Sequence, residues 1–231
     1  MVNEPNNGKR DRTTLENCAP SLNSKRRRTE LYENDGQSFK KLAHRDYTVG
    51  WVCALPIELA AAEAMFDELH EDLPPIQGDI NTYKLGSINQ HNVVIAVLPR
   101  NGYGTNNAAA VARDMERSFP SLRVRLMVGI GGGAPSQLDI RLGDVVVSDA
   151  VVQYDIGKVV QSGKFHPQGT LHRPPPELMT AVASLEATYR TKQGRVSRIL
   201  DGVLERNLSM AEFTSRRETF PFTFHPCARC C

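Results

Sequence analysis

The chain has 231 residues, a formal net charge of +2, 40% hydrophobic residues and 23% charged residues, which is the balance of one globular domain with tails. The sequence holds no run of the roughly 18 apolar residues that a membrane span requires, and its N-terminus lacks the apolar core of a secretory signal. Five unevenly spaced cysteines argue against a disulfide framework and fit a reducing compartment.

Positive charge is concentrated in residues 1–45, which carry a net charge of +4, whereas the remaining residues carry −2. This first segment is rich in Asn, Lys, Arg, Ser and Glu and is predicted to be a disordered basic tail. Its cluster Lys25-Arg26-Arg27-Arg28 fits a nuclear import signal, and a solvated charge run is the alternative. We therefore expect an intracellular protein, nuclear through this cluster or otherwise cytoplasmic. The folded part is not predicted to bind nucleic acid.

The predicted domain starts with a strand and a helix. Residues Tyr47–Cys53 are apolar enough for a strand buried on both faces, as in a parallel sheet. Pro56 suits the first position of a helix that is expected to end near Asp72. The predicted apolar stripe of this helix consists of Ile57, Ala61, Met65 and Leu69. Glu58 lies in the first turn, where a carboxylate either complements the helix dipole or faces the ligand-binding edge of an α/β sheet.

A hairpin and a second helix are predicted next. Strands over Asn81–Ile88 and Asn92–Leu98 flank a short turn. A glycine-containing loop, Pro99–Gly104, then leads into a helix from about Thr105 to Ser118. Small residues in this helix indicate that it packs close to the sheet.

A glycine-rich turn between two strands is the most informative stretch of the chain. An apolar run over Arg123–Val128 leads into Gly129-Ile130-Gly131-Gly132-Gly133, and a second strand follows at Val145–Ser148. Strand, glycine turn, loop and strand is a pattern that presents backbone N–H groups to a small ligand at the carboxyl edge of a sheet. A tight turn that needs glycine for steric reasons is the alternative. A dinucleotide-binding fingerprint is disfavoured because no helix follows the glycines directly.

The last third of the chain gives fewer signals. A helix is predicted from Glu177 to about Tyr189, and a helical pattern persists to about Phe213. Residues 219–226 are aromatic but predict no clear element. The spacing of His166 and His172 matches no metal-ligand pattern, and we expect no metal site and no cofactor.

Together these residues resemble the nucleoside phosphorylase and nucleosidase superfamily, of the purine/uridine phosphorylase type. The resemblance is closest to a fungal branch in which this domain often precedes NACHT, ankyrin or tetratricopeptide regions. The stretches that carry it are Val52–Ala60, Asn81–Tyr83, Met127–Gly133, Gly143–Ser148 and Val152–Asp155. The resemblance implies an α/β fold, with a mixed, mostly parallel sheet flanked by helices. It covers residues 46–190, which leaves 1–45 as a tail and 191–231 as a divergent, poorly ordered C-terminal tail.

The resemblance also implies cleavage of the N-glycosidic bond of a purine nucleoside. Because that bond breaks through an oxocarbenium-like sugar, the enzyme must activate a nucleophile, stabilise the cation and protonate the departing base. By resemblance, Glu58 is the catalytic carboxylate near an attacking water. The implied substrate-binding residues are Gly102, Tyr103, Gly104, Gly129, Ile130, Gly131 and Gly132.

Three departures from the family pattern qualify this expectation. Met127 stands where phosphorylases carry arginine and Ile130 where the family carries serine, so hydrolysis is favoured over phosphorolysis. Phosphate remains the candidate co-substrate, with Arg100 as a partial substitute. The residues that the family uses to hold the ribose and protonate the base are not found, so the domain is expected to be incomplete at its C-terminus. A catalytically inactive nucleoside-binding or signalling module is therefore the alternative. A half-sheet is also expected to pair its open edge with a second copy or a partner chain.

Overall fold

A computed structural model describes residues 39–133, 140–153, 155–160, 163–169, 171–191, 195–208, 210 and 224–227 of the chain. The chain divides into two units, residues 1–39 and residues 40–231. The first unit lies outside the described residues apart from Phe39, and the predicted basic cluster Lys25–Arg28 lies outside them with it.

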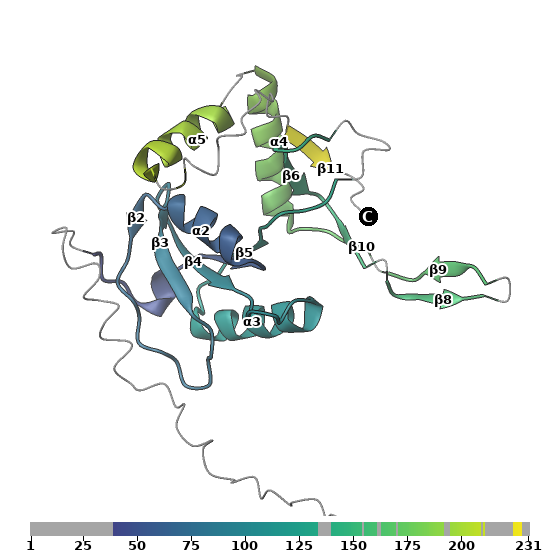
Figure 1. Cartoon of the computed structure of the whole chain (residues 1–231), viewed down its shortest axis with the longest axis horizontal. Coiled ribbons are helices and arrows are strands. Elements are labelled where there is room, and N and C mark those ends of the chain that lie inside the picture. Colours follow the sequence, from purple (N-terminus) through teal and green to yellow (C-terminus); the bar gives the residue numbers. More distant parts are fainter. Residues whose placement is uncertain are drawn as a thin grey trace, which may run out of the picture. The chain divides into compact units, whose positions relative to one another are not determined.

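The second unit contains a five-stranded mixed sheet in the order β2-β3-β4-β1-β5 (Figure 1). Its strands are β1 (Val49–Cys53), β2 (Glu68–Leu69), β3 (Tyr83–Ile88), β4 (His91–Val97) and β5 (Val124–Met127). Strand β1 runs parallel to both of its neighbours, β4 and β5, whereas β2, β3 and β4 pair antiparallel. The predicted α/β fold with a mixed sheet flanked by helices is confirmed.

Helices α2 (Pro56–Ala64) and α3 (Thr105–Ser118) cover opposite faces of this sheet. Alternate residues of β4 point to the two faces, so Val94 joins the core beneath α3 and Ile95 joins the core beneath α2. Both side chains are fully buried. The structure confirms the predicted bounds of α3. Gly104, the N-cap residue just before the helix, has a positive φ of +111°, a conformation that glycine adopts readily.

The predicted end and the predicted apolar stripe of the first helix were wrong. Helix α2 ends at Ala64, and the following residues form β2, in which Glu68 pairs with Ser87 and Leu69 with Gly86 of β3. The side chain of Phe66 is buried against the sheet, which turns the chain away from the helix axis. Ile57, Ala61 and Met65 of the predicted stripe are exposed, and the buried residues of the helix are Glu58, Ala62 and Ala64.

The hairpin of β3 and β4 agrees with its prediction. Tyr83 pairs with Ala96 and Ile88 pairs with His91 at the two ends of the ladder. Asn89 and Gln90 form the two-residue turn, with φ of +46° and +71°. Two positive φ angles match the right-handed twist of a hairpin, and asparagine tolerates that conformation well.

The chain after β5 forms smaller pairs of strands and two helices. Its elements are β6 (Val145–Ser148), β7 (Val151–Val152), β8 (Gly157–Val159), β9 (Phe165–Pro167), β10 (Leu171–His172), α4 (Pro176–Thr191), α5 (Arg195–Arg206) and β11 (Phe224–Cys227). Strand β6 has its predicted bounds but pairs in parallel with β11, a strand in the stretch where no clear element was predicted. Among the described residues, no helix is long and apolar enough to cross a membrane.

Helix α5 lies in the segment predicted as a poorly ordered tail, and it makes defined contacts. Val203 is buried, and Asn207 just after the helix donates a hydrogen bond of 3.3 Å from Nδ2 to the carbonyl oxygen of Ala64. That carbonyl belongs to the last turn of α2, where backbone oxygens lack partners within the helix. Arg206 adds an ion pair of 3.5 Å with Asp67. The domain boundary at residue 190 stays a prediction.

Candidate functional site

Three loops follow the three parallel strands of the main sheet, and they meet at one edge. Because β4, β1 and β5 run in the same direction, their carboxyl ends lie side by side. Backbone hydrogen bonds between neighbouring strands continue to the first residue of the loops after β4 and β5. Leu98 N–H donates to the Cys53 oxygen at 2.9 Å, and Val128 N–H donates to the Val52 oxygen at 3.1 Å. The structure thus brings together the three stretches that contain every predicted site residue.

Glu58 connects two of these loops through its carboxylate. Oε2 accepts hydrogen bonds from the backbone N–H of Ala54 at 2.8 Å and of Leu55 at 2.9 Å, directly after β1. Oε1 accepts a hydrogen bond of 2.7 Å from the backbone N–H of Ile130, in the turn after β5. Glu58 is the third residue of α2, so its bond to Leu55 is the returning half of a capping box. The residue is buried, with 8% of its surface exposed.

These hydrogen bonds decide the charge of Glu58. Burial alone raises the pKa of the Glu58 carboxyl, but the N–H groups of Ile130, Leu55 and Ala54 outweigh burial and hold the pKa below its usual value. The side chain is therefore an ionised carboxylate at neutral pH. Its effect reaches the buried thiol of Cys53, whose pKa is raised to about 11 by burial and by the negative charge of Glu58.

The glycine turn after β5 lies against this carboxylate. A Cβ added to Gly129 would lie 2.5 Å from Oε1 of Glu58, which is closer than real Cβ atoms approach another atom. Gly131 and Gly132 have open space where a Cβ would point. Of the predicted substrate-binding glycines, Gly129 therefore contacts the carboxylate, whereas Gly131 and Gly132 leave room beside the turn. The sequence did not show this contact, although the adjacency of β1 and β5 would have suggested it.

The side chains next to the turn are apolar and exposed. Ile130 is 76% exposed and Met127 is 63% exposed. Neither side chain can donate a hydrogen bond or offer a positive charge to an anion. The backbone N–H of Ile130 already binds Glu58.

The loop after β4 is the third part of the site. A turn is closed by the N–H of Gly102, which donates to the Pro99 oxygen at 2.8 Å. Tyr103 is 54% exposed, and Gly104 forms the N-cap of α3 without a side-chain cap. Arg100 is exposed in the same loop. This loop is positioned by the main sheet, and its side chains remain accessible to a ligand.

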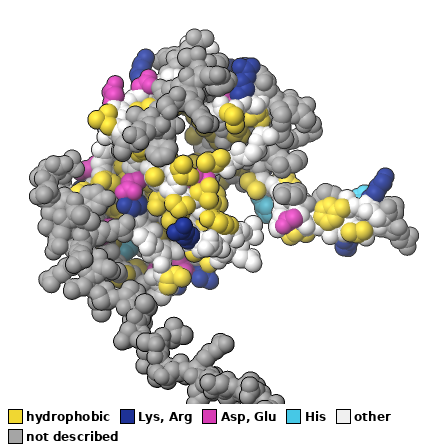
Figure 2. Space-filling view, viewed as in Figure 1, with side chains coloured by type: hydrophobic (Ala, Val, Ile, Leu, Met, Phe, Trp, Pro, Cys, Tyr) yellow, Lys and Arg dark blue, Asp and Glu magenta, His cyan; other side chains and the backbone are white. Residues whose placement is uncertain are grey.

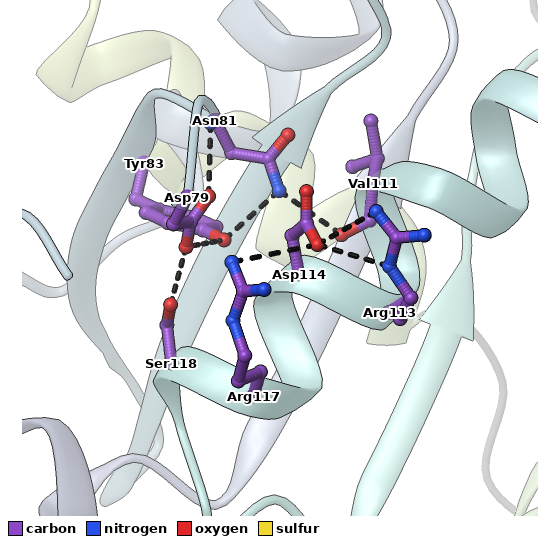
Figure 3. A network of polar contacts seen from close by, with 8 residues as sticks. All are labelled: Asp79, Asn81, Tyr83, Val111, Arg113, Asp114, Arg117 and Ser118. Atoms are coloured by element: carbon purple, nitrogen blue, oxygen red, sulfur yellow. Dashed lines mark hydrogen bonds and ion pairs between the residues drawn. The ribbon is translucent and has the colours of Figure 1, made fainter. Parts of the chain in front are cut away.

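The Asn81–Tyr83 motif belongs to a different polar network, which Figure 3 shows around Asp79. Asp79 accepts hydrogen bonds from the Tyr83 hydroxyl at 2.8 Å and from the Ser118 hydroxyl. Asn81 donates from Nδ2 to the Val111 oxygen at 3.0 Å. These contacts attach the segment before β3 to α3. The motif therefore holds the fold together, and α3 in turn fixes the loop after β4.

The described residues contain no group of three or more His, Cys, Asp or Glu side chains that could hold a metal ion. The candidate site consists of one carboxylate, a glycine turn and a second glycine-containing loop.

Comparison with known proteins identifies the family. A family model described as the phosphorylase superfamily matches residues 48–201. The chain belongs to the phosphorylase superfamily. The predicted resemblance to nucleoside phosphorylases and nucleosidases is confirmed, and the three loops of the site lie within the matched residues.

Relatives extend this result. A nucleotide-binding leucine-rich repeat (NLR)-like protein of Hyaloscypha variabilis is 51% identical over 168 residues, which cover 69% of this chain and 17% of that protein. This relative agrees with the predicted fungal branch. A 5′-methylthioadenosine/S-adenosylhomocysteine nucleosidase of Mycobacterium bovis is 33% identical over 111 residues, 48% of this chain and 39% of that protein.

A solved structure of the MTA/SAH nucleosidase of Streptococcus pneumoniae in complex with 8-aminoadenine aligns with a TM-score of 0.45 and 23% identity. The alignment covers 59% of this chain and 58% of the nucleosidase chain. In each of these comparisons the chain spans less than two thirds of the relative's own length.

Proposed function

We propose that this domain hydrolyses the N-glycosidic bond of a purine nucleoside at the edge formed by the loops after β4, β1 and β5. The observation that carries the proposal is the ionised Glu58 carboxylate, held against the glycine turn at the carboxyl edge of the sheet. The M. bovis relative, which is named as a nucleosidase acting on two adenine-containing compounds, supports the substrate class.

In the proposed reaction the oxygen of a water molecule bonds to C1′ of the ribose as the bond from C1′ to the base nitrogen breaks. The electron pair of the broken bond leaves with the base, which takes up one proton from the surrounding solvent. The water proton passes to the Glu58 carboxylate and is then released. Because an oxocarbenium-like sugar reacts even with a weak nucleophile, Glu58 needs to orient the water more than it needs to be a strong base. A carboxylate with a lowered pKa fits that role.

Hydrolysis is proposed over phosphorolysis because Met127 and Ile130 offer no side-chain donor to phosphate. The test is the release of free base from adenosine, inosine, guanosine, uridine and methylthioadenosine, with and without phosphate. Base release that is independent of phosphate supports hydrolysis. Release that requires phosphate would overturn this assignment and would direct attention to Arg100.

A nucleoside-binding module without catalysis is the second candidate. The exposed apolar side chains of Met127 and Ile130 beside the turn favour this candidate, because neither side chain can bind or activate a nucleophile. Isothermal titration with the same nucleosides separates the candidates. Binding without base release supports the module, and base release overturns it.

We also propose that the open edge of β5 pairs with a second copy of the chain. Among the described residues β5 pairs only with β1, and Leu126, Met127 and Val128 next to this edge are at least 37% exposed. Figure 2 shows hydrophobic side chains gathered where Figure 1 places β5. Val124 and Val128 direct their N–H groups to β1, so the backbone groups of Arg125 and Met127 face outward.

An antiparallel pairing of two β5 strands about Leu126 would place Arg125 of each copy opposite Met127 of the other. This arrangement avoids opposed like charges, and Arg125 already forms an ion pair with Glu116. Sedimentation equilibrium of the wild type and Met127→Lys tests the pairing. Concentration-dependent dimers that Met127→Lys removes support it, and a wild-type monomer at all concentrations overturns it.

A further inference from the structure

The two oxygens of Glu58 are used unequally. Oε2 accepts two backbone hydrogen bonds, from Ala54 and Leu55, whereas Oε1 accepts one, from Ile130. A carboxylate oxygen has two lone pairs, so these bonds occupy both lone pairs of Oε2 and one lone pair of Oε1. Oε1, the oxygen that lies against the glycine turn, therefore keeps one lone pair that can accept a further hydrogen bond.

The position of Oε1 depends on the absence of a side chain at residue 129. The point where a Cβ of residue 129 would lie is 2.5 Å from Oε1, 2.7 Å from Cδ and 2.8 Å from Oε2 of Glu58. Because the whole carboxyl group fills this space, even a methyl group there would push it away from the turn. The neighbouring Gly131 differs, since no atom lies within 4 Å of its added Cβ.

We propose that Gly129 is a positioning residue, which lets the Glu58 carboxylate bind the Ile130 N–H and thereby presents Oε1 as the oxygen that orients a ligand water or hydroxyl. This inference rests on the proposed function for the identity of the ligand. It assigns Gly129 a role different from the predicted one, because Gly129 acts through Glu58 rather than by lining the substrate itself. It also makes the turn after β5 and the charge state of Glu58 depend on each other.

The dependence can be measured without substrate. The carboxyl carbon of Glu58 is followed by ¹³C NMR through a pH titration of the full chain, with its signal assigned by its loss in Glu58→Gln. Gly129→Ala should raise the pKa of Glu58 by about one pKa unit or more, because a displaced carboxylate loses a charge-assisted hydrogen bond. Gly131→Ala is the matched control and should leave the titration of Glu58 unchanged. A Gly129→Ala chain with the wild-type titration of Glu58 would overturn the proposal.

A second measurement applies if Gly129→Ala does not fold. Hydrogen exchange of the Ile130 amide is compared in the wild type and in Glu58→Gln at neutral pH. Because the Ile130 amide donates to Oε1 and the residue is 76% exposed, the proposal predicts exchange about 10-fold faster or more when the carboxylate is replaced. Equal exchange rates in the two chains would contradict it.

These outcomes are separate from those of the proposed function. A chain with the predicted titrations that releases no base overturns the hydrolysis and leaves the position of Glu58 established. A chain that releases base, but in which Gly129→Ala leaves the Glu58 titration unchanged, overturns the role of Gly129 and leaves the hydrolysis standing.

Discussion

Oε1 of Glu58 lies 2.7 Å from the backbone nitrogen of Ile130, although 72 positions separate the two residues in the sequence. This hydrogen bond joins the first turn of α2 to the glycine turn after β5. It forms because β1 and β5 are parallel neighbours, so the chain segments that follow them leave the sheet at the same edge. A residue that closes a helix N-terminus therefore also positions a backbone turn in the candidate site.

Acid should weaken the fold through Glu58. The pKa of this carboxyl is lower in the folded chain than in the unfolded chain, where it is about 4.3. The carboxylate thus contributes stability above the unfolded pKa, and this contribution is lost as the pH falls through the folded pKa. Urea unfolding of the wild type and Glu58→Gln should show a stability difference that is largest above about pH 5 and shrinks on acidification. A difference that does not change with pH would contradict this prediction.

A side chain at Gly50 should destabilise the fold. A Cβ added to this residue of β1 would lie 2.8 Å from Sδ of Met115, which is on α3, and 3.1 Å from a methyl carbon of Leu122, and both residues are buried. Gly50→Ala is expected to lower the free energy of unfolding by about 1 to 3 kcal/mol, as overpacking usually does.

Gly202→Ala is the control for that substitution. Gly202 lies inside α5 with nothing within 4 Å of its added Cβ, so alanine should raise stability by roughly 0.5 to 1 kcal/mol through helix propensity. Thermal or urea unfolding measures both variants. Two changes of the same sign would contradict close packing of Met115 and Leu122 against Gly50.

The network around Asp79 should be a major support of the segment before β3. Asp79 accepts bonds from the Tyr83 and Ser118 hydroxyls and from the Asn81 N–H at 2.9 Å. Asp79→Ala leaves these donors without their acceptor and is expected to cost about 1 to 3 kcal/mol of unfolding free energy. Asp72→Ala, at an exposed position of the same segment, should change stability by less than about 0.5 kcal/mol. Equal effects of the two substitutions would argue against the network.

Local sequence signals predicted helix α3 and the β3–β4 hairpin well. Gly104 and Pro120 bracket α3, and Asn89-Gln90 supplies the positive φ angles of the turn. The end of α2 was missed because it depends on long-range contacts. Leu69 follows Met65 at the same four-residue spacing that links the earlier apolar residues of the predicted helix. In the structure, however, Leu69 lies in β2 and pairs with Gly86 of β3.

The candidate site was predicted as three separate stretches, and their contact could not be predicted from spacing. Glu58 was selected for its place at a helix start after a strand, which is a local signal. Its bond to Ile130 requires β1 and β5 to be neighbours, and this depends on pairing between segments more than 70 residues apart. The pairing of β6 with β11 is another long-range outcome, since residues 219–226 carried no periodic pattern.

Free-base release by the purified chain and its Glu58→Gln variant tests whether Glu58 supports hydrolysis of a nucleoside. The nucleoside panel is incubated with each chain, and Glu71→Gln, at an exposed position, serves as the matched control. We expect phosphate-independent release from a purine nucleoside, a decrease of about 10²- to 10⁴-fold in Glu58→Gln, and no change in Glu71→Gln. Equal rates in the wild type and folded Glu58→Gln, or no release by the folded wild type, would contradict this expectation.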